Sequence, residues 1–271
     1  MTGLPPPATT VARDMAEGVP AATGKRTLGG GNLPRKKKVK GSKKMLQKQR
    51  RNEPLKEESR SVAAKTGGQQ ALFFMQHLAA STSASVIERE EFKLKGSAFK
   101  TADYLVNGAQ QSGGATDQQE ISIAKLAVAL RSPYLSRKPV AVPQKCGSPR
   151  VICVSDSALR AVDVARAFAP VKCGVSKLFG KHFKEQEQAD YLSTSTAMVA
   201  VGTPHRLHRL CASGGLKLDS LALLIIDMKP NVKGATIFDQ KQLSYSLATW
   251  YREHIHVRVA ANQVKICFSG A

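Results

Sequence analysis

The chain has 271 residues, with 41 Lys or Arg against 20 Asp or Glu, and a formal net charge of +21. This balance excludes an acidic disordered activator and argues against an enzyme without a polyanionic partner. Hydrophobic residues make up 42% of the chain, so part of it is expected to bury a core. The five scattered cysteines show no paired spacing, which is typical of reduced thiols inside the cell.

The charge is concentrated near the N-terminus. Residues 1–66 hold 16 basic and 5 acidic side chains, a net of +11, and few large apolar residues. Such a segment buries too little surface to offset the entropy of ordering, so we expect a disordered basic arm. Residues 67–271 hold 25 basic and 15 acidic side chains, a net of +10, and are predicted to form the folded domain.

Ten basic residues and no acidic one occur in residues 35–51 (RKKKVKGSKKMLQKQRR). The dense first part predicts a nuclear-import signal formed by Arg35, Lys36, Lys37, Lys38 and Lys40. The same side chains, together with Lys43 and Lys44, can displace counterions from phosphates, which predicts RNA binding. A solvated tail with neither role is the alternative. We expect both roles, and hence an import receptor and RNA as partners.

The first elements of the folded part follow from apolar spacing and turn residues. Residues 70–80 (QALFFMQHLAA) predict a helix, and residues 86–99 predict an extended connector. Residues 107–119 are polar and Gly-rich, which predicts a mobile loop. A second short helix is expected at residues 123–131. Four prolines in residues 132–149 predict an ordered or partly ordered loop.

From residue 151 onward, short apolar runs alternate with segments of helical spacing. The predicted strands are residues 151–155, 174–179, 197–201, 221–227 and 264–268. The predicted helices are residues 158–168, 184–192, 204–212 and 240–254. Apolar strands that alternate with helices predict an α/β fold with a doubly wound, mostly parallel sheet and right-handed crossovers. The longest uninterrupted apolar run has six residues, so we expect a soluble intracellular protein with no membrane partner.

The segment MVAVGTPHR is the most informative part of the chain. A strand runs into Gly202, Thr203 and Pro204, and a helix starts at once. Free backbone N–H groups and the positive end of the helix predict a phosphate site, to which Arg206 and Arg209 add charge. Thr203 is expected to cap this helix, with Pro204 at its first position. The alternative is that the Thr-Pro pair is only a good helix start.

Several motifs occur in the order of a known family. The strand followed by Gly-Thr-Pro-x-Arg, the buried strand ending at Asp227 and the terminal sequence ICFSGA resemble the first RecA-like domain of DEAD-box RNA helicases. The segments SALRAVD, KLFGKHFK, VGTP and GGLKL, between residues 157 and 218, more closely resemble the Cms-type family. That family comprises helicase-derived nucleolar proteins of the small-subunit processome, the early small-subunit pre-ribosome. The resemblance covers residues 69–271.

The resemblance carries over to individual residues. The Gly-Thr-Pro-x-Arg motif matches the helicase motif that contacts the RNA backbone, although His205 replaces the usual glycine. Residues 155–161 lie where a second RNA-contacting motif would be. The RNA contacts expected in the domain are Gly202, Thr203, Pro204, Arg206, Arg209, Ser157 and Arg160.

The resemblance also identifies what is missing. Asp227 matches the first acid of the DEAD box, but Met228, Lys229 and Pro230 follow it in place of the catalytic Glu. No phosphate-binding loop precedes residue 151. Phosphoryl transfer needs a cradle for the triphosphate, a metal held by carboxylates and a positioned water. We therefore expect no enzyme, no catalytic residue and no cofactor, with Asp227 as a vestigial acid.

The sequence contains only weak candidates for other metal-binding or catalytic residues. His205 and His208 share a helix face, yet no Cys, Asp or Glu nearby in the sequence completes a metal-ligand set. We therefore expect no metal site, and histidines that lie on the surface or face RNA. Cys153 lies within a predicted strand, which favours a small buried hydrophobe over a nucleophile.

These observations favour a non-enzymatic ribosome-biogenesis factor of the nucleus and nucleolus, built on a degenerate RecA-like domain. Its expected partners are pre-ribosomal RNA, small-subunit processome proteins and a nuclear import receptor. Two alternatives stay open. One is an ATP-binding remnant of a DEAD-box-like RNA helicase, or a nucleotide switch. The other is a general nuclear RNA-binding adaptor outside ribosome assembly.

Overall fold

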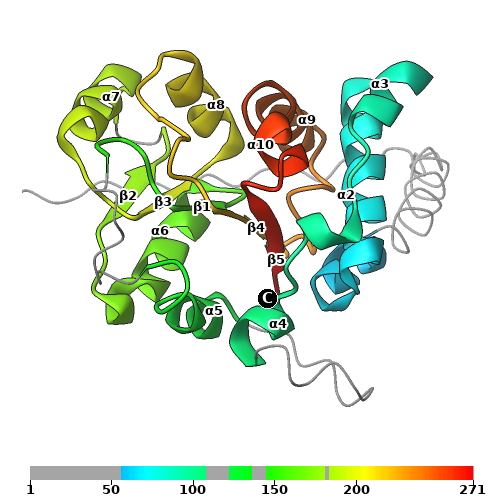
Figure 1. Cartoon of the computed structure of the whole chain (residues 1–271), viewed down its shortest axis with the longest axis horizontal. Helices are drawn as coiled ribbons and strands as arrows, with labels where there is room; N and C mark the ends of the chain where they lie inside the picture. Colours follow the sequence, from blue (N-terminus) through cyan, green and yellow to red (C-terminus); the bar gives the residue numbers. More distant parts are fainter. Residues whose placement is uncertain (1–55, 108–121, 136–144, 181–182, 271) are drawn as a thin grey trace, which may run out of the picture. The chain divides into compact units, whose positions relative to one another are not determined.

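A computed structural model describes residues 56–107, 122–135, 145–180 and 183–270, and Figure 1 shows how their helices and strands are arranged. The predicted basic arm up to residue 55, including the import signal and the arm lysines assigned to RNA, lies outside the described residues. So do residues 108–121, which contain nearly all of one predicted loop, and residues 136–144 of the other.

Among the described residues, one sheet is built from β1 (Val151–Val154), β2 (Val175–Leu178), β3 (Val199–Gly202), β4 (Leu223–Asp227) and β5 (Lys265–Ser269). The strand order is β2-β3-β1-β4-β5, and every neighbouring pair is parallel. The strands β1, β3 and β4 are buried along their whole length, as expected where helices cover both faces of a sheet. The predicted parallel, doubly wound α/β arrangement is confirmed.

The helices are α2 (Gly67–Thr82), α3 (Val86–Glu91), α4 (Ala102–Asn107), α5 (Ile123–Ala129), α6 (Ala158–Ala167), α7 (Glu185–Thr194), α8 (Pro204–Ala212), α9 (Lys241–Trp250) and α10 (His256–Ala260). Short 3₁₀ turns are η1 (Val62–Ala64), η2 (Gly96–Ala98) and η4 (Ala169–Val171). The predicted helix at 240–254 is instead α9, a π-helical turn, η5 (Tyr251–Ile255), and α10. None of the described helices is long and apolar enough to cross a membrane.

Two hydrophobic clusters lie on opposite faces of the sheet. Side chains alternate along a strand, so Ile152 and Val154 of β1 join the cluster with α2, α7, α8 and α9. Val151 and Cys153 join the cluster with α5 and α6 on the other face. Figure 1 shows α7, α8 and α9 on one side of the sheet and α5 and α6 on the other. The carboxyl ends of the strands remain between these two helical layers.

The crossover helices follow from the strand order. The chain moves from β1 to β2 in one direction across the sheet, and the next three crossovers move in the opposite direction. The first crossover, through α6, lies on the opposite face from those through α7, α8 and α9. All four crossovers therefore have the same hand, in agreement with the rule used for the prediction.

The extended connector predicted at residues 86–99 is wrong in its first half, which forms α3. The Ser85 hydroxyl accepts a hydrogen bond from the Glu88 N–H, and the Glu88 carboxylate accepts one of 2.7 Å from the Ser85 N–H. This reciprocal capping box starts the helix despite its short length. Later in the segment, Phe99 forms a single parallel bridge with Ile266 at the edge of β5, and α4 follows.

The predicted boundary between residues 66 and 67 falls too late in the chain. Val62 is fully buried in the core cluster that contains α2 and α9. The side-chain amide of Gln70, on α2, donates to the Val62 carbonyl oxygen at 3.2 Å, and the Ser59 hydroxyl donates to the Asp239 carboxylate at 3.1 Å. Residues 56–66 therefore belong to the folded domain rather than to the arm.

This packing predicts different outcomes for two truncations. Removing residues 1–66 should lower the free energy of unfolding by about 2 kcal/mol more than removing residues 1–55, because the buried Val62 side chain alone is worth about 1.5–3 kcal/mol. Urea denaturation of both truncated proteins, compared with the full chain, measures the difference. Equal unfolding midpoints for the two truncations would show that residues 56–66 do not stabilise the domain.

Candidate nucleic-acid interface

The predicted contact residues of the domain gather where the parallel strands end. Ser157 lies two residues beyond the Ser155 that follows β1, Thr203 follows β3 directly, and Asp227 is the last residue of β4. Because β1 pairs with both β3 and β4, these positions occupy one edge of the sheet. In open α/β sheets, ligands bind at this edge. The fold therefore brings the sequence-predicted positions of the domain together.

The turn after β3 depends on a glycine. Gly202 is buried, and a Cβ atom there would overlap the carbonyl oxygen of Leu178 and lie 3.0 Å from a methyl carbon of Leu207. The chain therefore passes directly from β3 into α8, with Pro204 at the first helical position as predicted. The expected cap by Thr203 is wrong, because its side chain makes no capping hydrogen bond. The Thr203 side chain thus accepts no hydrogen bond from the first N–H groups of α8.

Two arginines of α8 are directed toward α7. The Arg206 guanidinium donates from Nη1 to Oε1 of Gln188 at 3.0 Å, and Arg206 is only partly exposed. Gln188 is itself fixed, since its Nε2 donates to the carbonyl oxygen of Phe179 at 3.1 Å. Arg209 donates from Nε to Oε2 of Glu185 at 2.8 Å. Both side chains are therefore held in place before any ligand binds.

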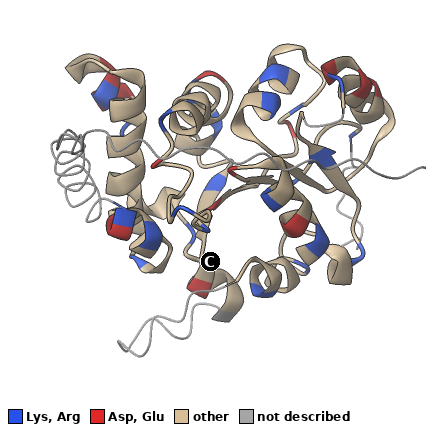
Figure 2. Ribbon diagram, turned by 180° about the vertical axis from the view of Figure 1, so that it is seen from behind, with Lys and Arg blue, Asp and Glu red and all other residues tan. Residues whose placement is uncertain are grey.

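Acidic residues lie beside these basic ones. Glu185 and Glu187 are in the first turn of α7, where negative charge suits the positive end of the helix dipole. Figure 2 shows the red acidic positions of α7 next to the blue basic positions of α8. The acidic side chains of α7 lower the positive potential around them. Arg206 pairs with a neutral amide and Arg209 with a carboxylate, so the charge of Arg206 is more available to an anion than that of Arg209.

The predicted RNA contact Arg160 makes a different interaction. Its Nε donates to Oδ2 of Asp227 at 2.6 Å and its Nη2 donates to Oδ1 at 3.0 Å. The Asp227 side chain is 2% exposed and that of Arg160 is 16% exposed. The pair joins the connection after β1 to the end of β4, and the connections of these two strands leave toward opposite faces of the sheet. Arg160 is thus paired with Asp227, and Ser157 caps α6 by accepting a hydrogen bond from the Arg160 N–H at 3.2 Å.

Sequence spacing missed a cluster on α8. No acid near His208 in the sequence was found to complete a metal-ligand set, but the fold brings one from a distant segment, since Nε2 of His208 is 2.7 Å from Oε2 of Glu253. The next residue, His254, joins the same cluster. The partners are 45 residues apart in the chain, so no local spacing pattern indicates them. The other predicted surface histidine, His205, is exposed.

The interpretation of Cys153 as a buried hydrophobe is supported. Its side chain is fully buried, and burial raises the pKa of its thiol well above the usual value. Burial likewise raises the pKa of Cys267 to about 12. A thiolate is the nucleophilic form of cysteine, so neither residue is suited to covalent catalysis.

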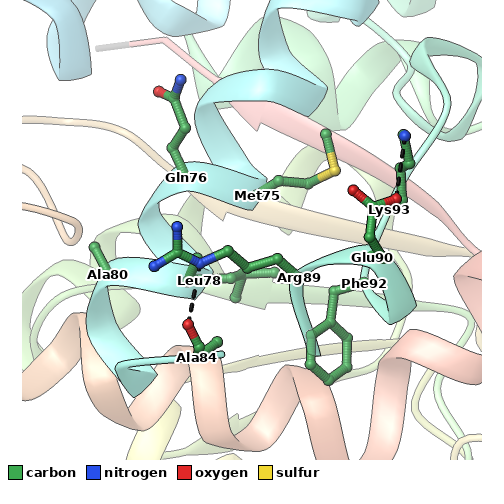
Figure 3. Close-up of a pocket in the computed structure, with 10 residues that line it drawn as sticks. Met75, Gln76, Leu78, Ala80, Ala84, Arg89, Glu90, Phe92 and Lys93 are labelled. Carbon is green, nitrogen blue, oxygen red and sulfur yellow. Dashed lines mark hydrogen bonds and ion pairs between the residues drawn. The ribbon is translucent and has the colours of Figure 1, made fainter. Parts of the chain in front are cut away.

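A separate pocket of about 340 Å³ lies between α2 and α3 (Figure 3). Met75, Leu78 and Phe92 contribute apolar surface to it. At its rim, Arg89 donates from Nε to the Ala84 carbonyl oxygen at 3.0 Å. Its lining includes none of the predicted RNA contacts, so this pocket is not part of the interface at the strand ends.

These features define an α/β domain with a parallel, doubly wound sheet, a Gly-Thr-Pro turn after one strand and an acid at the end of the next. The family model for CMS1, described as a U3-containing 90S pre-ribosomal complex subunit, matches residues 130–269. The chain belongs to this family. Membership supports a role in ribosome biogenesis.

Individual relatives agree with this assignment. The chain is 26% identical over 225 residues to protein CMS1 of Chaetomium thermophilum, covering 79% of this chain and 87% of that protein. It is 32% identical over 144 residues to human protein CMSS1, covering 52% of this chain and 46% of that protein. The chain thus spans somewhat less than half the length of the human relative.

Solved structures with a similar fold include a DEAD box protein of Methanococcus jannaschii, at 17% identity and a TM-score of 0.39. The match covers 55% of this chain and 36% of that chain. A hypothetical ATP-dependent RNA helicase of Sulfolobus tokodaii matches at 14% identity and a TM-score of 0.38. That match covers 72% of this chain and 50% of the other.

The tight turn after β3 predicts a specific sensitivity to a methyl group. Gly202→Ala should lower the free energy of unfolding by about 1–3 kcal/mol, because the backbone of β2 has to move to admit the new atom. Gly180→Ala is the matched control, since its Cβ would meet the guanidinium end of the Arg206 side chain instead of backbone. Chemical denaturation of both variants measures the effect. A Gly202 variant as stable as the control would contradict the close approach of β2 and β3 at this turn.

The pair of Arg160 and Asp227 predicts a non-additive stability effect. Arg160→Met should cost about 3 kcal/mol, because it leaves a buried carboxylate without its partner. The double variant Arg160→Met/Asp227→Leu should be more stable than Arg160→Met alone, since no charge is then left buried. Urea denaturation of the single and double variants forms the thermodynamic cycle. Losses that simply add would show that the two side chains do not depend on each other.

Proposed function

We propose that this protein is a non-enzymatic ribosome-biogenesis factor of the small-subunit processome, which binds pre-ribosomal RNA and assembly proteins in the nucleolus. The description of its family as a 90S pre-ribosomal complex subunit supports both the process and the compartment. The excess of 21 positive charges suits a polyanionic partner. The proposal is that the domain docks on the pre-ribosome through the edge where its strands end.

The non-enzymatic part of the proposal rests on one observation, the pairing of Asp227 with Arg160. Both of its carboxylate oxygens accept hydrogen bonds from Arg160, and the side chain is almost fully buried. The next position is Met228, which is buried in the core, where a DEAD box has its Glu. A carboxylate that is closed off by a guanidinium has no free oxygen directed at a metal-bound nucleotide. This arrangement favours a structural role for the acid over a catalytic one.

The RNA-binding part rests on the turn after β3 and on Arg206. Backbone N–H groups at the start of α8 and the positive end of that helix suit a phosphate oxygen. Arg206 lies within the first turn of the same helix and is already positioned by Gln188. A side chain that is ordered before binding loses less entropy on contact. Phosphate contacts of this kind fix the position of a protein on RNA and carry little sequence information.

The basic segment at residues 35–44 supplies the second part of the proposed RNA contact and the import signal. Its lysines and arginine remain a prediction from the sequence, because they lie outside the described residues. Loose phosphate binding by such a segment weakens steeply as salt is added. In the proposed arrangement the arm provides affinity and import, while the turn and Arg206 determine where the domain sits.

The test is crosslinking of the full chain to RNA in cells, followed by sequencing of the RNA and identification of co-purified proteins. The wild-type protein should recover early small-subunit precursor RNA together with processome proteins. Arg206→Glu should reduce crosslinking of the domain, and in vitro it should lower the salt slope of RNA binding by about 1. Arg166→Glu makes the same charge change at an exposed site on α6 and serves as the control.

Three outcomes would overturn parts of the proposal. Recovery of only spliceosomal or other nuclear RNA would favour the adaptor alternative. Binding of ATP to the full chain at millimolar concentration, together with loss of that binding in Asp227→Ala, would favour the nucleotide switch. Equal crosslinking by the Arg206 and Arg166 variants would show that the start of α8 is only a helix start.

A further inference from the structure

Three potential metal ligands meet on the side of the sheet that carries α8 and α9. His208 comes from α8, and Glu253 and His254 come from the π-helical turn η5. The Nε2 atom of His208 lies 2.7 Å from Oε2 of Glu253, and the Nε2 atom of His254 lies 3.9 Å from the same oxygen. All three ligand atoms lie within 4.8 Å of one another. Two imidazoles therefore converge on one carboxylate.

Hydrogen bonding within the described part of the protein leaves this arrangement incomplete. The Nε2 atom of His254 is buried and has no hydrogen-bond partner there. The nearby His256 is different, because its Nδ1 is 3.1 Å from the Tyr251 hydroxyl and its Nε2 is 3.0 Å from the Glu91 carbonyl oxygen. His256 is a fully bonded structural histidine. His254 instead directs a free polar atom at the carboxylate, which indicates that a further group satisfies it.

The backbone that presents two of the ligands is unusual. Residues Tyr251–Ile255 form a π-helical turn between α9 and α10. Such turns are rare and occur frequently at functional sites, because the extra residue in the turn redirects the side chains that follow. Here it brings adjacent residues, Glu253 and His254, to the same partner on α8. The π-helical turn is thus a second observation, independent of the residue types, that points to a binding role.

We propose that His208, Glu253 and His254 bind one Zn²⁺ ion, with water completing the coordination. Imidazole nitrogen and carboxylate oxygen bind zinc at about 2.0–2.2 Å, which places tetrahedral ligands about 3.3–3.5 Å apart. One of the two measured separations is shorter than this and the other is longer, so small side-chain rotations accommodate the ion. Magnesium and calcium prefer oxygen ligands and do not suit two imidazoles.

The ion would connect two elements that already touch. In this region the Trp250 indole donates from Nε1 to Sγ of Cys211, on α8, at 3.3 Å. A zinc ion would replace the direct contact between His208 and Glu253 with coordination that also holds His254, so that the ion links α8 to the segment that follows α9. Half of the Glu253 side chain is exposed, so an ion reaches the cluster from solvent without unfolding. The inference is independent of RNA binding, because none of the three residues belongs to the turn after β3.

The test is titration of the full chain, purified without a histidine tag, with Zn²⁺ by isothermal calorimetry and with Co²⁺ by visible absorption. We expect one ion per chain and the intense Co²⁺ bands of tetrahedral coordination. Glu253→Gln and His254→Ala should each weaken binding at least about tenfold, in line with the effect of perturbing metal sites. Circular dichroism shows whether the variants remain folded. Glu253→Gln changes an exposed side chain, so it should leave the fold intact.

His205→Ala is the matched control, since it removes an exposed histidine from the same helix, three residues before His208. Its zinc affinity should equal that of the wild type. Millimolar Mg²⁺ should not displace the bound ion. The proposal is overturned if the wild-type protein binds no zinc. It is also overturned if the Glu253 and His254 variants bind as tightly as the control, because the ion would then be held elsewhere, for example by cysteines.

Discussion

The ion pair between Arg160 and Asp227 is the constraint on which the strand-end edge depends. A carboxylate that is 2% exposed is stable as an anion only if a nearby positive group offsets its loss of hydration. Arg160 does this with two hydrogen bonds, and in doing so it fastens the start of α6 to the end of β4. The connection after β1 and the end of β4 are thereby joined by the protein's own side chains.

The other predicted contacts lie at the end of β3. There the chain turns at Gly202, whose missing side chain lets the Leu178 carbonyl approach. Arg206 and Arg209 of α8 donate hydrogen bonds to Gln188 and Glu185 of α7. This side of the edge therefore presents hydrogen-bond donors that are held in fixed positions. One Arg thus pairs with the acid at the end of β4, and another lies at the start of α8.

The sequence predicted those parts of the structure that depend on local pattern. Continuous apolar runs located the strands, and Pro204 marked the start of α8. The helix α3 was missed because its scattered charges show no helical pattern. The capping box of Ser85 and Glu88 nevertheless stabilises it. The partners of Arg160 and His208 are 67 and 45 residues away, and only the parallel sheet order brings them close. Their role in the site therefore follows from topology, which no spacing rule supplies.

The helix α8 is fixed along its whole length. Its start is set by the glycine turn, its middle by the contacts of Arg206 and Arg209 with α7, and its far side by His208 and by the Cys211 contact with Trp250. A cycle of nucleotide-driven closure requires elements with two discrete arrangements. A helix held from three directions instead favours a single arrangement, and a rigid, preorganised surface loses less entropy when it docks. The packing of α8 therefore suits an assembly factor that positions its partners.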